Sequence, residues 1–131
     1  MPSIFTRIVA REIPAHILHE DSDFLAFLDV RPIREGHSLV IPKAEVPDMF
    51  DLPESVLAGL LPFARPVARA IQQVTQAARI GTAVIGLEVP HAHLHLVPID
   101  GIHDLDFRRA RPVADEELAA TAERIRTALT S

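Results

Sequence analysis

Apolar side chains recur every three to four residues near both ends of the chain. Residues 3–12 show this helical spacing until Pro14 interrupts it, which predicts a short N-terminal helix. Residues 115–129 begin with acidic side chains, carry arginines nearer their end, and hold apolar positions at the same spacing. Acids at the start and bases toward the end of a helix suit its dipole, so a C-terminal helix is predicted there.

The middle of the chain carries a longer helical pattern with two interruptions. Between residues 51 and 78, apolar side chains fall near a 3.6-residue period. Pro62 and Pro66 lie inside this stretch, and each removes a backbone hydrogen-bond donor. The pattern therefore predicts either one bent helix or two shorter helices in sequence.

Strand-length apolar segments separate these helices. Turn-forming residues 21–23 lie between the first two segments, and Gly86 and Pro90 mark a bend between the last two. The first three segments suit an antiparallel meander, and the whole pattern predicts one α+β domain over residues 1–131. The predicted strands are residues 16–20, 24–30, 38–41, 83–89 and 91–97.

Composition and charge narrow the range of partners. A chain of 131 residues suffices for one hydrophobic core but is too short for two comfortable ones. The formal net charge of −5 argues against a large basic surface and therefore against binding of duplex nucleic acid. A mononucleotide needs only a few donors in one place, so the charge leaves small anionic ligands open.

Signals for targeting and for an oxidising compartment are missing from the sequence. There is no cysteine, which excludes disulfide bonds and cysteine-based zinc sites. The first residues show no basic segment followed by a long apolar one, so no signal peptide is predicted. No apolar run approaches the roughly 20 residues of a membrane span. We expect a cytoplasmic protein without a membrane partner.

The most distinctive segment is an alternation of histidine and apolar residues over positions 91–97. On a strand this alternation puts His91, His93 and His95 on one face, and the apolar residues on the other. Same-face side chains lie roughly 6–7 Å apart, so a phosphate over His93 would be within reach of both neighbours. A neutral imidazole can attack phosphorus and form a covalent intermediate, while flanking histidines orient it and stabilise developing charge.

Two other interpretations of these histidines stay open from the residues alone. They could be structural, although three desolvated imidazoles would each need a hydrogen-bond partner. Histidines two positions apart are also common ligands of zinc and related ions, and Glu88, Asp100 or Asp104 could complete such a site. Against this, three collinear imidazoles on a flat strand spread too widely to bind one ion.

Four segments resemble the histidine triad (HIT) family, over roughly residues 3–98. Residues 91–97 match its signature His-φ-His-φ-His-φ-φ, in which φ is apolar. Residues 12–15 (E-I-P-A), residues 23–30, and residues 36–43 (G-H-S-L-V-I-P-K) are similar to further blocks of the family in the same order. The resemblance implies a HIT-like α+β fold with an antiparallel sheet of about five strands, a long central helix and a C-terminal helix. It also implies a homodimer.

The resemblance also implies roles for individual residues. His93 would be the nucleophile that takes the nucleoside monophosphoryl group, His91 and His95 would position it, and His37 would support them from the neighbouring strand. Asp29 would accept hydrogen bonds from the ribose hydroxyls. No cofactor and no metal ion would be needed. The apolar pocket for the base would consist of Ile4, Phe5, Ile8, Phe27, Val30 and Leu39.

Two departures from the family pattern bear on this interpretation. Many members carry Cys-x-x-Cys near the N-terminus for a structural zinc ion, whereas this chain has Ser3 and Thr6. Members also tend to carry Asn and Gln in the loop before the triad, where they help to hold the phosphate and the leaving group. Residues 80–90 contain neither, and Leu87 or Glu88 takes the place of a polar donor. An acid beside a substrate phosphate would repel it unless the acid points away.

These features together predict an enzyme that acts on a purine nucleotide conjugate. It would hydrolyse or transfer at the α-phosphorus of a nucleoside phosphoramidate, a dinucleoside polyphosphate or an adenylated small molecule, through a phosphohistidine intermediate. The altered loop favours one alternative, a nucleotide-binding module with little or no turnover. A histidine-based metal-binding protein is the other alternative.

Overall fold

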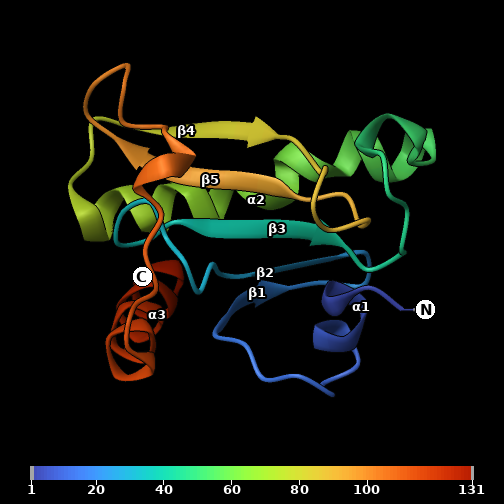
Figure 1. Cartoon of the computed structure of the whole chain (residues 1–131), viewed down its shortest axis with the longest axis horizontal. Coiled ribbons are helices and arrows are strands. Elements are labelled where there is room, and N and C mark those ends of the chain that lie inside the picture. The colour runs from blue at the N-terminus through green and yellow to red at the C-terminus, as the bar shows by residue number, and fades with distance from the viewer. Residues whose placement is uncertain (1, 131) are drawn as a thin grey trace.

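A five-stranded sheet forms the centre of the fold, with the strand order β1-β2-β3-β5-β4 (Figure 1). The computed structural model describes residues 2–130. Neighbouring strands run antiparallel throughout, which confirms the predicted fold class and the number of strands. The strands are β1 (Ile17–Glu20), β2 (Phe24–Leu28), β3 (Ser38–Pro42), β4 (Arg79–Val84) and β5 (Leu94–Ile99).

Helices cover the sheet and its ends. In Figure 1, α2 crosses behind the sheet, and α1 and α3 lie toward opposite ends of β1. No helix within residues 2–130 is long and apolar enough to cross a membrane. The helices are α1 (Ile4–Val9), α2 (Glu54–Thr75) and α3 (Asp115–Leu129), with short 3₁₀ helices η1 (Met49–Asp51) and η2 (Phe107–Arg109).

Helix α2 is continuous through both of its prolines, so the alternative of two shorter helices is wrong. Pro62 and Pro66 are exposed on the solvent side of the helix. The carbonyl groups that they leave without an intrahelical donor belong to Ala58 and Pro62, which are also exposed. Water can satisfy those carbonyls, so the prolines do not divide the helix.

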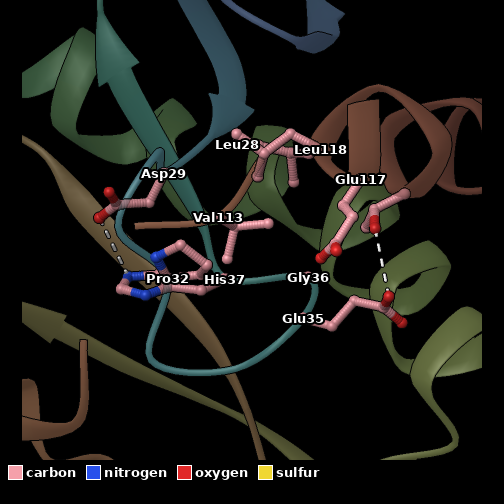
Figure 2. A pocket seen from close by; sticks show the side chains of 10 residues that line it. Leu28, Asp29, Pro32, Glu35, Gly36, His37, Val113, Glu117 and Leu118 are labelled. Atoms are coloured by element: carbon pink, nitrogen blue, oxygen red, sulfur yellow. Dashed lines mark hydrogen bonds and ion pairs between the residues drawn. The ribbon is translucent and has the colours of Figure 1, made fainter. Parts of the chain in front are cut away.

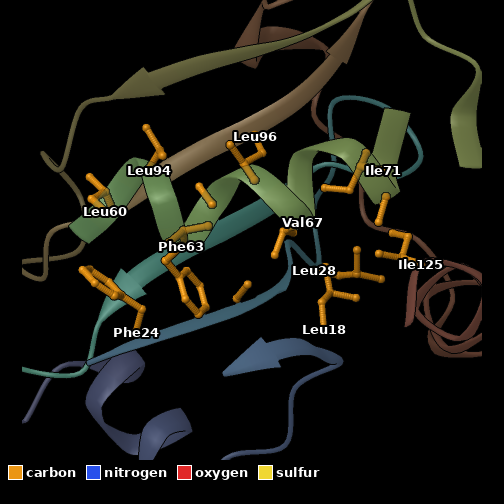
Figure 3. Close-up of a cluster of buried hydrophobic side chains, with 14 of the residues drawn as sticks. Leu18, Phe24, Leu28, Leu60, Phe63, Val67, Ile71, Leu94, Leu96 and Ile125 are labelled. Carbon is orange, nitrogen blue, oxygen red and sulfur yellow. The ribbon is translucent and has the colours of Figure 1, made fainter. Parts of the chain in front are cut away.

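The main core lies between α2 and one face of the sheet (Figure 3). Alternate residues of each strand point to this face, and α3 closes the core at one end. Dispersion contacts and the removal of apolar surface from water hold the layers together without polar partners. The labelled members are Leu18, Phe24, Leu28, Leu60, Phe63, Val67, Ile71, Leu94, Leu96 and Ile125.

A second, smaller apolar cluster lies on the opposite face of the sheet. Phe5 and Ile8 of α1 pack there against the other set of alternate residues of β2 and β3. Because both faces are covered, every residue of β2 and β3 is buried. The strand members of this cluster are Leu25, Phe27, Leu39 and Ile41.

The last two strands differ from their predicted bounds. The strand predicted over residues 83–89 overlaps β4 only at residues 83 and 84, because β4 already begins at Arg79 and the chain leaves the sheet after Val84. The strand predicted over residues 91–97 begins only at Leu94. Ahead of it, the Ala92 amide donates to the carbonyl of Val46, which lies beyond the end of β3, and so residues 91–93 are not part of the ladder.

Gly36 anchors the loop between β2 and β3 to the core. Its φ of +96° is a left-handed conformation that side chains disfavour. A Cβ atom at this position would lie 3.0 Å from Thr75, 3.1 Å from Ile71 and 3.4 Å from Pro98. A larger residue would therefore displace the loop that connects Asp29 to His37.

Candidate active site

Four histidines gather on the α1 face of the sheet. The ring centroids of His93 and His95 are 5.0 Å apart, and those of His37 and His95 are 5.2 Å apart. The predicted separation of faces holds even though His91 and His93 precede β5, because Ala92, Leu94 and Leu96 all belong to the core on the α2 side. His91 and His37 are 0% and 1% exposed, whereas His93 and His95 each retain 8%. Solvent therefore reaches only two of the four rings.

Hydrogen bonds fix which nitrogen carries the proton in His37 and His95. Nδ1 of His37 accepts from the Ile33 amide at 2.9 Å, so the proton of this neutral ring lies on Nε2. That Nε2–H donates to Nδ1 of His95 at 3.0 Å. The proton of His95 consequently lies on Nε2, which has no hydrogen-bond partner within residues 2–130 and is not buried. The pair presents one N–H donor to solvent.

The same reasoning gives His93 the opposite tautomer. Its Nδ1 lies 2.7 Å from the carbonyl oxygen of His91, and because a carbonyl only accepts, Nδ1 carries the proton. In the neutral ring Nε2 of His93 is then the nitrogen without a proton, and it has no partner among the described residues and some solvent access. The site thus places a bare imidazole nitrogen next to the N–H donor of His95.

His91 is held from both sides and does not face a ligand. Its Nε2 lies 2.7 Å from the carbonyl oxygen of Pro42, so it donates there. Its Nδ1 accepts from the Ser3 hydroxyl at 2.8 Å. With both ring nitrogens bonded to protein, His91 positions the chain around His93.

Burial keeps the supporting histidines neutral. It lowers the pKa of His37 to about 4, and burial followed by the charges of His37 and His93 lowers the pKa of His95 to about 4. Burial is also the largest cause that lowers the pKa of His91. At neutral pH each of these three rings holds a single proton, as the hydrogen-bond assignment requires.

Asp29 follows β2 and lies beside His37. Its Oδ1 accepts from the Arg31 amide at 2.9 Å, and its Oδ2 is 3.6 Å from Nε2 of His37. Because His37 donates to His95 at shorter range, Oδ2 keeps its lone pairs for another donor. Burial, the largest contribution, raises the pKa of Asp29.

The residues predicted to surround a base fall into two groups. Phe5, Ile8, Phe27 and Leu39 form one buried cluster on the histidine face, and the Phe5 ring lies 5.0 Å edge-on from His93. Ile4 and Val30 lie outside it and are 49% and 59% exposed. The structure therefore brings four of the six apolar residues together next to the triad.

A small cavity lies behind the site, between the β2–β3 loop and α3 (Figure 2). Asp29 and His37 border it on one side, and Glu35 and Thr121, joined by a hydrogen bond, border it on the other. Its volume of about 80 Å³ is well below the roughly 300 Å³ of a typical small-molecule site. A nucleotide has no room there, so the open histidine face is the candidate binding surface.

One cluster in the described part of the chain has the spacing of metal ligands. Asp29, His37 and His95 offer ligand atoms within 4.8 Å of one another, and the acids considered from the sequence do not belong to this cluster. A metal ion would need the lone pair of His37 Nε2, yet the amide directed at Nδ1 requires the proton on Nε2. The cluster fits a hydrogen-bonded relay better than a metal site.

Several contacts at the site were not predicted from the sequence. The Phe107 ring of η2 lies 4.8 Å edge-on from His95 and closes the side opposite α1. The Ile33 amide and the Ser3 hydroxyl orient two of the histidines. No sequence motif marks the Phe107 contact, whereas Ser3 could have been suspected as a helix cap. Glu88 is exposed in the loop after β4.

Fold and site together define an α+β domain that presents neutral histidines beside an apolar cluster, and residues 10–102 match the HIT domain family. The adenosine 5′-monophosphoramidase of Saccharomyces cerevisiae is 38% identical over 96 residues, which are 72% of this chain and 61% of the yeast protein. A HIT-like protein from Bartonella henselae superposes with a TM-score of 0.84 at 30% identity, covering 96% of this chain and 95% of that one. A zinc-bound histidine triad family protein from Mycobacterium smegmatis gives a TM-score of 0.83 at 33% identity, covering 97% of this chain and 92% of that one.

The chain belongs to the HIT family. The resemblance seen in its sequence is confirmed by the family match and by the solved structures. The prediction that it is an enzyme of the HIT type, with nucleotide hydrolysis as its class of reaction, is confirmed as well.

Proposed function

We propose that the protein cleaves a purine nucleotide conjugate at its α-phosphorus, with His93 as the nucleophile. The observation that carries the proposal is the contact of His93 Nδ1 with the His91 carbonyl, which leaves Nε2 of His93 without a partner among the described residues and open to solvent. The apolar cluster around Phe5 would hold the base, and Asp29 would accept from the ribose hydroxyls. A nucleoside phosphoramidate is the favoured substrate, in keeping with the activity named for the yeast relative.

In the first step, Nε2 of His93 forms a bond to the α-phosphorus as the bond to the leaving group breaks. Nε2–H of His95 donates to a phosphoryl oxygen, where negative charge grows in the transition state. His95 is neutral and has one proton, so it acts as a hydrogen-bond donor rather than as an acid. The leaving amine therefore takes its proton from water at the open face.

In the second step, water attacks the phosphohistidine and releases the nucleoside monophosphate, which returns His93 to its starting form. An alcohol or phosphate in place of water would make the same step a nucleotidyl transfer. The carbonyl oxygen of His91 accepts from Nδ1–H of His93 in both steps and offsets the positive charge that develops on the ring.

The test is turnover of a fluorogenic adenosine phosphoramidate by the wild type and by His93→Ala. We expect the variant to lose at least about a thousandfold in kcat, since it lacks the nucleophile, while it still binds AMP. His16→Ala is the matched control, because His16 pairs with Asp115 away from the site and its loss should leave kcat unchanged. A wild type that binds AMP but releases no product would instead support the binding-module alternative.

We also propose a homodimer, formed through the free edge of β4. In the strand order β4 has a neighbour on one side only, and a groove between α2 and β4 is lined by Leu61, Ala68 and Ile80. Leu61 is 63% exposed and Val84 at the end of β4 is 43% exposed. Sedimentation equilibrium should give a molecular mass twice that of the chain, and Leu61→Glu should reduce it to the mass of a single chain.

A cytoplasmic location stays a prediction.

A further inference from the structure

The N-terminal helix is fastened to the histidines by four polar side chains, Ser3, Thr6, Glu45 and His91, which we call the α1 clamp. Oε1 of Glu45 accepts from the Ser3 amide at 2.6 Å and from the Thr6 hydroxyl at 2.5 Å. Ser3 Oγ also lies 2.8 Å from Nδ1 of His91. Ser3 is 6% exposed and His91 is fully buried, whereas Glu45 is exposed, so only the bond between Ser3 and His91 is shielded from water. The clamp connects a loop, a helix start and the first triad histidine.

Every proton in the clamp can be assigned. His91 donates to Pro42 through Nε2, so its Nδ1 must accept, and Ser3 Oγ–H is the donor. The remaining lone pairs of Ser3 Oγ accept from the Thr6 amide at 3.0 Å, which caps α1. Thr6 Oγ1–H is directed to Glu45. Each donor in the clamp therefore has an acceptor within it or at Pro42.

The clamp occupies the positions at which many HIT proteins carry thiolates for zinc. Zinc in proteins is bound by thiolate, imidazole or carboxylate, and a closed structural site uses four such ligands. Here Ser3 and Thr6 supply neutral hydroxyl groups, which leaves one carboxylate and one imidazole. The residues present do not fit a structural zinc ion.

We propose that hydrogen bonds of the α1 clamp take the place of the structural metal, and that Ser3 and Glu45 are positioning residues for the nucleotide site. The link to the site is direct. Helix α1 carries Phe5, whose ring lies 5.8 Å from His91 and 5.0 Å from His93. Release of the clamp frees this wall of the apolar cluster while the bond from His93 to the His91 carbonyl stays in place. The part that concerns catalysis rests on the proposed function.

The first test separates binding from chemistry with Glu45→Ala. We expect the Kd for AMP and the KM for the phosphoramidate to rise about tenfold, as for loss of a hydrogen-bonded anchor. The change in kcat should be less than about threefold, because the tautomers of His93 and His95 do not depend on Glu45. Glu45→Gln keeps an oxygen acceptor and should recover most of the lost affinity.

Asp21→Ala is the matched control. Asp21 is an exposed acid whose Oδ1 also accepts two bonds at 2.8 Å, from the amides of Asp23 and Phe24, and none of its bonds reaches α1 or a histidine. The Asp21→Ala variant should lose stability as Glu45→Ala does, but its affinity for AMP should be unchanged. Equal effects of Glu45→Ala and Asp21→Ala on AMP affinity would overturn the positioning role.

Two further measurements do not depend on turnover. Ser3→Ala should shift the ¹⁵N resonance of Nδ1 in His91 and leave those of His37 and His95 in place. A chelator should leave the Tm of the wild type unchanged, whereas the double variant Ser3→Cys/Thr6→Cys should bind one zinc ion with Glu45 and His91 and become chelator-sensitive.

A wild type whose Tm falls with chelator, or a double variant that binds no zinc, would contradict the clamp as described. A wild type that neither binds AMP nor turns over the phosphoramidate would defeat the proposed function. In that case the ¹⁵N resonances and the response to chelator would still test whether the clamp is bonded as described and free of metal.

Discussion

The two faces of the sheet bury side chains for different purposes. On the α2 face, the core is apolar and its members are interchangeable in kind, since only volume and shape are required of them. On the α1 face, four histidines are desolvated, and each ring is usable only because a specific partner fixes its proton. Burial on one face supplies stability, whereas burial on the other selects protonation states.

The largest expected effect lies on the α2 face. Ile125 of α3 is fully buried in the main core and far along the chain from the histidines. Ile125→Ala should lower the free energy of unfolding by about 2–5 kcal/mol, and Ile125→Val by about 0.5–1.5 kcal/mol. Urea denaturation measures both, and kcat of the folded fraction should stay within about twofold. A fall in kcat that tracks the lost stability would show that the two faces are not separable.

The next effect is the pH dependence of stability, which belongs to the histidine face. His37 and His95 have pKa values of about 4 in the folded protein against 6.5 as the ordinary value. Between those values the unfolded chain binds protons that the folded chain does not, so stability is complete above pH 6.5 and falls as the pH drops. Between pH 7 and pH 5 the loss should be roughly 2 kcal/mol per histidine.

Denaturation midpoints at several pH values test this slope. His37→Gln should flatten it, since one of the two depressed groups is removed. An unchanged slope in His37→Gln would contradict the assignment of the stability loss between pH 7 and pH 5 to His37 and His95.

A smaller effect is expected for the ribose contact. Asp29→Asn keeps an oxygen toward the Arg31 amide but removes the carboxylate charge. A hydrogen bond to a charged group contributes roughly 1.5–3 kcal/mol, so affinity for AMP should fall by about tenfold or more. Calorimetry with AMP and with 2′-deoxy-AMP checks whether Asp29 contacts the 2′-hydroxyl of the ribose. Equal losses for both nucleotides would place Asp29 away from the 2′-hydroxyl.

The smallest effect should come from the point where elements of the two faces meet at the sheet edge. His16, which follows α1 in the chain, lies 2.8 Å from Oδ1 of Asp115 at the start of α3. Asp115 is 88% exposed, and exposed pairs contribute at most about 1 kcal/mol. Asp115→Asn should therefore lower the free energy of unfolding by at most about 1 kcal/mol and leave AMP affinity unchanged. A large change in either would mean that the faces communicate through this edge.

Local periodicity predicted much of the fold. The three helices and the strands β2 and β3 follow from spacing and turn residues, because those signals lie within each element. The start of β5 could not be predicted in the same way. It depends on Val46, which takes the Ala92 amide out of the ladder, and the two residues are far apart in the sequence.

The candidate site divides along the same line. The alternation at residues 91–97 correctly separated inward from outward side chains, since that property is local. The tautomers were beyond reach, because they are set by Ile33, Ser3 and the carbonyl of Pro42. The contact of Phe107 with His95 comes from a segment whose path over the sheet no short motif records.

Gly36 has a consequence for how the chain tolerates change. The position is closed by Ile71 and Thr75 in the last turn of α2 and by Pro98 at the far end of β5. A bulkier residue at any of the three would press on the loop and reorient His37 without touching a histidine. Selection on the chemistry therefore extends to residues that never meet a substrate, and Ile71 and Thr75 should accept fewer substitutions than the exposed Glu54 and Ser55 at the start of α2.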